Sequence, residues 1–193
     1  MWKKTLLLLL TVCLCLFMAA CGSSGSGDTG GAASGSTAAD SSGDPLAVTG
    51  EVGKFKTKDL DGNEVTEAIF AEKDMTVLHI WGTFCGPCIE EMAEVGELAK
   101  GLPENAQLIG IVCDVMALNS AEHQDALDIL KENNAEFTNL ITSSELEKFV
   151  REFQFVPTTL IIDSEGNVCG APIVGAGTDR YQSAAQRYLD SLS

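Results

Sequence analysis

Basic residues are scarce in this chain, which has 12 Lys and Arg against 28 Asp and Glu in 193 residues and a net charge of −16. Two of the basic residues, Lys3 and Lys4, stand at the N-terminus, and without them the net charge is −18. Nucleic acids and anionic lipids are bound through positive patches, so the composition argues against both as partners. We interpret the acidity as favouring solubility outside the cell.

A long apolar run is also lacking. The run Leu6–Ala20 is short for a membrane span and follows two lysines, which is typical of the h-region of a secretory signal. It ends in small residues before Cys21, a pattern that resembles a bacterial lipobox. Residues 1–20 are therefore predicted to be a lipoprotein signal peptide and Cys21 the lipidated residue, with a simple secretion signal or an uncleaved anchor as the alternatives.

Large apolar side chains are absent from residues 22–44, which are almost all Gly, Ser, Ala, Thr and Asp. Such a segment cannot bury enough surface to offset its ordering entropy. Residues 21–44 are therefore predicted to be a lipidated cysteine and a disordered Gly/Ser-rich tether, and residues 45–193 the folded domain. The expected location is extracytoplasmic, lipid-anchored to the bacterial cell membrane.

Metal ligands are few as well. A structural zinc site needs four ligands. Beyond the Cys85-x-x-Cys88 pair the folded domain offers only the scattered side chains of Cys113, Cys169, His79 and His123. We predict neither a metal nor a cofactor.

The most informative motif is Trp81–Cys88, which places Cys85 and Cys88 between an apolar strand-like run and a helical pattern. Two thiols at a strand-to-helix turn can close into a disulfide and reopen. Cys85 is the predicted nucleophile because backbone N–H groups at a helix start favour the thiolate, an effect that Glu90 and Glu91 weaken. Cys88 would then resolve the mixed disulfide. A purely structural disulfide is the weaker interpretation, since so short a loop removes little chain entropy.

The remaining pattern is that of a compact α/β domain. Asp61-Gly62-Asn63 predicts a hairpin turn between segments 55–60 and 65–70. Capping signals predict a helix after Ser120 and a short helix opened by Ser144 with Glu147 three residues on. The other predicted elements are strands over 77–81, 108–113, 158–162 and 168–174 and helices over 87–102 and 178–189.

This order of elements, with the dithiol after the first core strand, resembles the thioredoxin superfamily, specifically the membrane-tethered TlpA/ResA-like oxidoreductases. The matching segments are Trp81–Cys88, Val156–Gly166 and Asp59–Asn63, and the resemblance spans about residues 50–193. It implies a thioredoxin-like three-layer α/β/α sandwich, with a mixed central sheet and an N-terminal β-hairpin.

The resemblance also implies how a client protein is held. In the family, the proline at the position of Pro157 is cis and packs beside the dithiol, and Val156 would offer backbone groups to an extended client segment. An ordinary trans-proline at the start of an edge strand is the alternative. The candidate client-binding residues are Trp81, Phe84, Gly86, Pro87, Val156 and Pro157.

His79 departs from the family pattern. It stands six residues before Cys85, where thioredoxins have a buried acid that relays protons. We hypothesise that His79 exchanges a proton with Cys88, and a core histidine bonded to the backbone is the equal alternative. Glu91 or Asp114 could supply an active-site carboxylate instead.

Cys113 and Cys169 are predicted to stay reduced. The resemblance places two strands between theirs, and three inter-strand steps come to about 14 Å, beyond the roughly 7 Å that a disulfide can bridge between Cα atoms. Free cysteine usually packs as a small apolar residue, so an accessory redox role for Cys113 is the minor alternative.

The predicted function is therefore that of a protein disulfide reductase. Gly86-Pro87 is the dipeptide of thioredoxin itself, and the resemblance implies a reducing potential. It also implies electrons from an integral membrane thiol donor of the CcdA/DsbD type, with apocytochromes or a partner sulfoxide reductase among the disulfide-containing clients.

Three other functions share this fold. A disulfide-forming oxidase would differ only in potential. A thiol peroxidase shares the fold but has a hydroxyl-bearing residue at the position of Gly82 in this chain. A copper chaperone would use Cys-x-x-x-Cys and a distal histidine, and the spacing here is one residue shorter.

Overall fold

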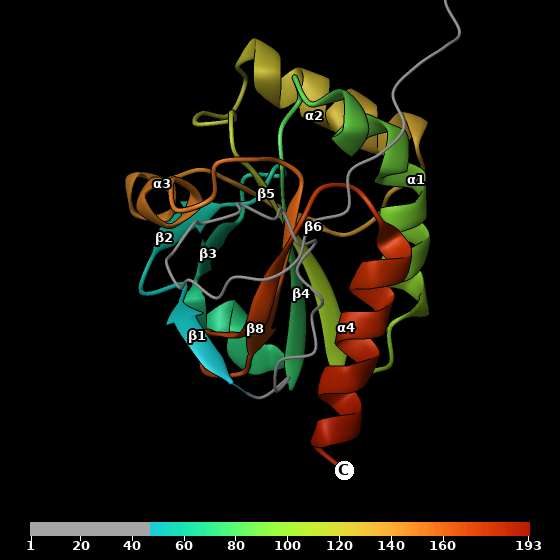
Figure 1. Ribbon diagram of the computed structural model, residues 1–193. Coiled ribbons are helices and arrows are strands. Elements are labelled where there is room, and N and C mark those ends of the chain that lie inside the picture. The colour runs from blue at the N-terminus through green and yellow to red at the C-terminus, as the bar shows by residue number, and fades with distance from the viewer. Residues whose placement is uncertain (1–46) are drawn as a thin grey trace, which may run out of the picture. The chain divides into compact units, whose positions relative to one another are not determined.

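The computed structural model describes residues 47–193 (Figure 1). The predicted signal peptide, the Cys21 lipidation site and the tether up to residue 44 lie outside the described residues. Within residues 47–193, no helix combines the length and the apolarity that a membrane crossing requires.

A six-stranded mixed sheet forms the centre of the domain, with strand order β1-β8-β7-β4-β5-β6. The inner strand β4 pairs parallel with β5 and antiparallel with β7, and β5 pairs parallel with β6. The strands are β1 Val48–Glu51, β4 Met75–Trp81, β5 Ala106–Val112, β6 Thr138–Ile141, β7 Thr158–Asp163 and β8 Asn167–Val174. Every residue of β4 is buried, as expected for a central strand covered on both faces.

Helices cover both faces of this sheet, as the resemblance implied. Figure 1 shows α1 (Gly86–Gly101) and α4 (Thr178–Ser191) along one face and α3 (Ser144–Val150) on the other side. Alternation along β4 directs Leu78 and Ile80 into the core on the α3 side, while Val77 packs against α4. The predicted three-layer sandwich is confirmed.

Smaller elements complete the two faces. The predicted hairpin is present as β2 (Lys56–Lys58) and β3 (Glu64–Thr66), which form a separate two-stranded sheet. The second half of the apolar segment 65–70 is not strand but part of the 3₁₀ helix η1 (Glu67–Glu72), which buries Phe70. Helix α2 (Ala121–Glu132) begins after the cap Ser120, as predicted.

Two strands and one cap differ from the prediction. The edge strands β1 and β6 were missed, because β1 is wholly exposed and β6 has only four residues, so neither shows an alternating apolar pattern. The cap of α3 is Ser143, whose hydroxyl accepts the Leu146 N–H, rather than Ser144. Both serines are suitable N-cap residues, but only Ser144 has a glutamate three residues later, and the backbone nevertheless places the cap at Ser143.

Candidate active site

The dithiol lies where β4 ends and α1 begins. Cys85 is the N-cap of α1 and Cys88 lies in its first turn, and the two form a disulfide with a Cα–Cα distance of 5.3 Å. The Cys85 sulfur accepts the Cys88 N–H at 3.3 Å, which shows the unpaired helix N–H groups directed at this sulfur. Such a donor stabilises a thiolate when the disulfide is reduced.

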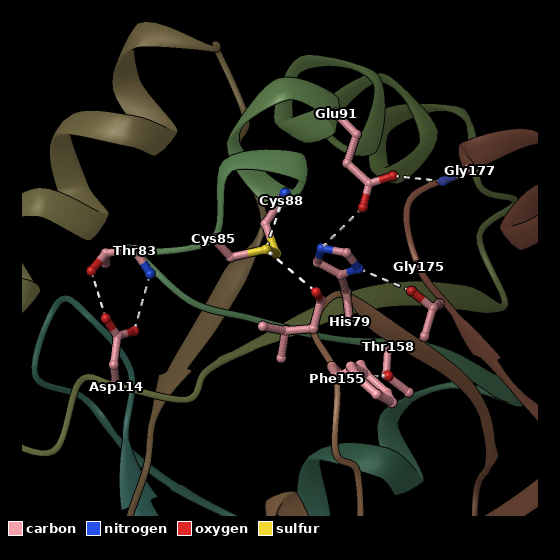
Figure 2. The surroundings of a disulfide bond; sticks show 12 residues. His79, Thr83, Cys85, Cys88, Glu91, Asp114, Phe155, Thr158, Gly175 and Gly177 are labelled. Carbon is pink, nitrogen blue, oxygen red and sulfur yellow. Dashed lines mark hydrogen bonds and ion pairs between the residues drawn. A yellow bond between two sulfur atoms is a disulfide. The ribbon is translucent and has the colours of Figure 1, made fainter.

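The loop before Cys85 is held by two contacts. Thr83 donates both its N–H and its hydroxyl to the carboxylate of Asp114, which follows β5 (Figure 2). Gly82 leaves room for its neighbours, because a Cβ there would lie 2.6 Å from the Phe84 ring and 3.0 Å from Cys113 Sγ. Asp114 therefore acts here as an anchor of the loop, and the carboxylate that lies beside the buried histidine described below is that of Glu91.

The proline loop lies against the nucleophile. The Val156–Pro157 peptide bond is cis, as the resemblance implied. The Val156 carbonyl oxygen lies 3.5 Å from Cys85 Sγ, so a reduced Cys85 thiol can donate to it. The Gly175 N–H donates to the Pro157 carbonyl and ties this loop to the one after β8.

A buried pair of titratable residues lies close to the disulfide (Figure 2). His79 is fully buried in β4, and its Nδ1 is 2.9 Å from the Thr159 hydroxyl. Its Nε2 is 3.9 Å from Glu91 Oε1, and among residues 47–193 this Nε2 is the one buried side-chain nitrogen or oxygen without a hydrogen-bond partner. Glu91, in α1, is also buried and accepts the Gly177 N–H at 2.8 Å.

Tyr181 connects this pair to the loop after β8. Its hydroxyl lies 3.0 Å from Glu91 Oε1 and 3.0 Å from the Gly175 carbonyl oxygen. A phenol has one proton, so it can donate to only one of the two oxygens. When Glu91 is protonated, it can donate to the Tyr181 oxygen, and the phenol then donates to the Gly175 carbonyl. When Glu91 is ionised, its carboxylate accepts the phenol proton.

Burial displaces both pKa values of the pair toward the neutral forms. It lowers the pKa of His79 from 6.5 to about 4, so the imidazole is uncharged at neutral pH. Burial raises the pKa of Glu91, while the Gly177 N–H, the Tyr181 hydroxyl and the charge of Arg180 partly offset the rise. The site thus has an uncharged imidazole with a free nitrogen next to a carboxyl whose pKa lies closer to neutrality than usual.

Trp81 requires a correction among the predicted client-binding residues. Its side chain is fully buried, so it cannot touch a client, because the last residue of β4 faces the core under α1. Phe84, Gly86 and Pro87 are exposed, and Val156 is half-buried while Pro157 is buried beside Cys85. The prediction included Trp81 because of its place in the motif, which does not reveal the direction of its side chain.

The structure also shows an apolar surface around the disulfide, of which the sequence predicted only Phe84. Six large apolar side chains are exposed among the described residues, and four of them come from segments that meet at this end of the sheet: Phe84, Met116, Phe155 and Val174. Phe84 precedes Cys85, Phe155 precedes Val156, and Val174 pairs with Thr158. Met116 follows the Asp114 anchor. We call these four residues the apolar rim.

Cys113 and Cys169, the other two cysteines within residues 47–193, are free, as predicted. Two strands, β7 and β4, separate β8, which contains Cys169, from β5, which Cys113 follows. Burial and the charge of Asp114 raise the pKa of Cys113 to about 11, and burial also raises that of Cys169. Neither is a thiolate at neutral pH. Within residues 47–193, no group of three or more His, Cys, Asp or Glu side chains is arranged to hold a metal ion.

A helix-capping dithiol beside a cis-proline, on a thioredoxin-like fold, defines a thiol–disulfide oxidoreductase. Residues 34–186 match the Redoxin family, and the chain belongs to this family. Its resemblance to the TlpA/ResA-like proteins of the thioredoxin superfamily is confirmed by the relatives described next.

Two curated relatives are similar over more than half of the chain. A "Thioredoxin-like protein" of Haemophilus influenzae is 29% identical over 122 residues, which cover 63% of this chain and 67% of the relative. "Thiol-disulfide oxidoreductase ResA" of Bacillus thuringiensis is 27% identical over 125 residues, covering 61% and 67%.

Solved structures share the fold. A thiol:disulfide interchange protein of Chlorobium tepidum superimposes with a TM-score of 0.57 at 21% identity, covering 72% of this chain and 97% of that one. StoA of Bacillus subtilis gives 0.52 at 17% identity, covering 70% and 96%.

Proposed function

We propose that this chain is an extracytoplasmic, lipid-anchored oxidoreductase that reduces disulfides in client proteins through Cys85 and Cys88. The observation that supports this most directly is the unequal access to the two sulfurs. Cys85 has a small exposed fraction of 6% and lies between exposed loop residues, whereas Cys88 is fully buried. A client can therefore reach Cys85, and Cys88 can attack only Cys85.

The reaction follows from this arrangement. The Cys85 thiolate attacks one sulfur of the client disulfide, the client S–S bond breaks, and the other client sulfur leaves as a thiolate. Cys88 then attacks Cys85 Sγ in the mixed disulfide and releases the second client thiolate. The client gains two electrons, and the Cys85–Cys88 disulfide seen here is the oxidised product.

The resolving step needs a base, because a buried Cys88 thiol does not ionise readily. The His79–Glu91 pair is our candidate for taking its proton. Both side chains lie on one side of the disulfide in Figure 2, away from the Thr83–Asp114 anchor. The free Nε2 of His79 offers an acceptor for the proton, and the raised pKa of Glu91 makes its carboxylate a stronger base than an exposed one.

The apolar rim supports a polypeptide client. Exposed large apolar side chains gathered around a reactive group usually mark a binding surface. Here Phe155 directly precedes Val156 of the cis-proline loop and Phe84 directly precedes Cys85, where an extended client segment would lie. We propose clients whose disulfide cysteine is flanked by apolar residues in a flexible segment.

Anchoring and electron supply complete the proposal. A lipid on Cys21 and the tether would hold the domain at the outer surface of the membrane. An oxidising exterior cannot return the enzyme to the dithiol form, so electrons would come from an integral membrane thiol donor of the CcdA/DsbD type. The lipid is tested by Cys21→Ser, which should release the protein from the membrane fraction.

The deciding experiment is the reduction potential of the Cys85–Cys88 couple, measured by equilibration with glutathione or dithiothreitol. A value near that of thioredoxin, about −270 mV, supports a reductase. A value toward that of DsbA, about −120 mV, would reverse the proposed direction and make the chain a disulfide donor. Cys88→Ser should accumulate a mixed disulfide with a client, and Cys85→Ser should not.

The space around Gly82 argues against the thiol peroxidase alternative. The Phe84 ring and the Cys113 sulfur occupy the place where a hydroxyl-bearing side chain would project from position 82. A peroxide assay should accordingly show no turnover above that of ordinary thiols.

A further inference from the structure

Trp81 is held by a buried amide from an edge strand. Its indole Nε1–H donates to Asn139 Oδ1 at 2.9 Å, and both side chains are almost completely buried. The amide is itself fixed, because Asn139 Nδ2 donates to the Phe137 carbonyl oxygen at 2.9 Å. This hydrogen bond orients the carboxamide so that its oxygen faces the indole.

A glycine in the intervening strand makes this contact geometrically feasible. Gly110 of β5 is in register with His79 of β4 on one side and with Asn139 of β6 on the other. A Cβ at Gly110 would lie only 1.9 Å from Asn139 Oδ1. The carboxamide therefore lies over the bare backbone of β5 and reaches across it to Trp81.

Trp81 in turn packs in the cluster that contains the dithiol. The buried members of this cluster include Cys85, Cys88 and Met92 together with the indole. The Trp81 carbonyl also accepts the Cys113 N–H at 2.8 Å at the point where β4 leads into the Gly82 loop. The orientation of the indole therefore affects the packing around both sulfurs.

We propose that Asn139 is a positioning residue of the redox site, which locks the Trp81 indole against the dithiol so that Cys88 meets Cys85 in the geometry that resolution requires. The proposal rests on the proposed disulfide exchange. It adds a residue that acts through Trp81 and meets neither the dithiol nor the client. Attack on a disulfide needs an aligned approach, and a small misplacement of packed groups can lower a rate by about a hundredfold.

The test uses the full chain carrying Trp2→Phe, so that Trp81 is its one tryptophan. The ¹⁵N–¹H signal of the indole is recorded in the oxidised and reduced forms. In the parent protein we expect a single, exchange-protected indole signal that shifts on reduction. In Asn139→Leu the protection should be lost, and the rate of client reduction should fall at least tenfold.

Three further variants separate positioning from general stability. Gln107→Leu removes a half-buried amide that donates to Thr76 and Ile69 at the far end of the same strands, and it should leave the indole signal and the exchange rate unchanged. Gly110→Ala should displace the Asn139 amide and reproduce the loss. Asn139→Asp keeps an acceptor oxygen but loses the donor to the Phe137 carbonyl, so it should restore only part of the protection and rate.

Two results would overturn the proposal. One is an Asn139→Leu protein with a protected indole signal and the parent exchange rate. The other is an equal loss of indole protection and exchange rate in Gln107→Leu, which would show that the effect of Asn139→Leu comes from a general loss of stability. If the parent protein fails to reduce any client while its indole still responds to Asn139 substitution and to reduction, the proposed function is wrong and the positioning of Trp81 stands.

Discussion

The buried His79 makes stability depend on pH in a way that can be measured. In the folded protein burial lowers its pKa from 6.5 to about 4, and in the unfolded chain its pKa is the ordinary one. Between these two values the unfolded state binds the proton and the folded state does not. The contribution of the neutral histidine to the free energy of unfolding is therefore fully present above pH 6.5 and is lost as the pH falls to about 4.

The size of the effect follows from the two pKa values. A difference between 6.5 and about 4 corresponds to about 3 kcal/mol in the free energy of unfolding. Glu91 acts in the opposite sense. Because its pKa is raised in the folded protein, its contribution to the free energy of unfolding is lost as the pH rises through the folded-state pKa. The comparison is therefore made in Glu91→Gln protein, which removes the second titration.

The assay is urea unfolding of oxidised Glu91→Gln with and without His79→Gln, followed by circular dichroism between pH 7 and pH 4. The free energy of unfolding of the protein with His79 should fall by about 3 kcal/mol relative to the double variant over this range. Parallel pH dependences in the two proteins would refute a neutral, buried His79.

Three further predictions concern the site. Glu91→Gln keeps an acceptor for the Gly177 N–H but removes the proposed base. The rise in exchange rate as the pH passes through the raised Glu91 pKa should therefore disappear, and the rate above that pKa should fall by about a hundredfold or more. An unchanged pH–rate profile would exclude Glu91 as the base. Gly82→Ala brings a methyl group against Phe84 and should lower the free energy of unfolding by about 1–3 kcal/mol in urea titrations. Cys113→Ala should leave the reduction potential and the exchange rate unchanged, whereas a shifted potential would give this thiol a redox role.

Local patterns were sufficient to predict most of the fold. The apolar run of β4, the Gly-Pro between the cysteines and the start of α1 are all contiguous, so their signals lie within a few residues. The edge strands escaped because an exposed strand such as β1 has no alternating burial to leave a pattern. The cap of α3 was misplaced by one residue because Ser143 and Ser144 offer the same side chain.

The sequence by itself determined the dithiol, its position at a helix start and, through the family resemblance, the cis-proline beside it. The tertiary structure alone decided what surrounds them. Glu91 meets the Gly177 N–H across 86 residues, and Trp81 meets Asn139 across 58. Such contacts arise from the order of strands in the sheet, which brings distant segments together without any local signal. The same packing buries Trp81 and exposes the apolar rim, and so separates the residues that shape the site from those that can meet a client.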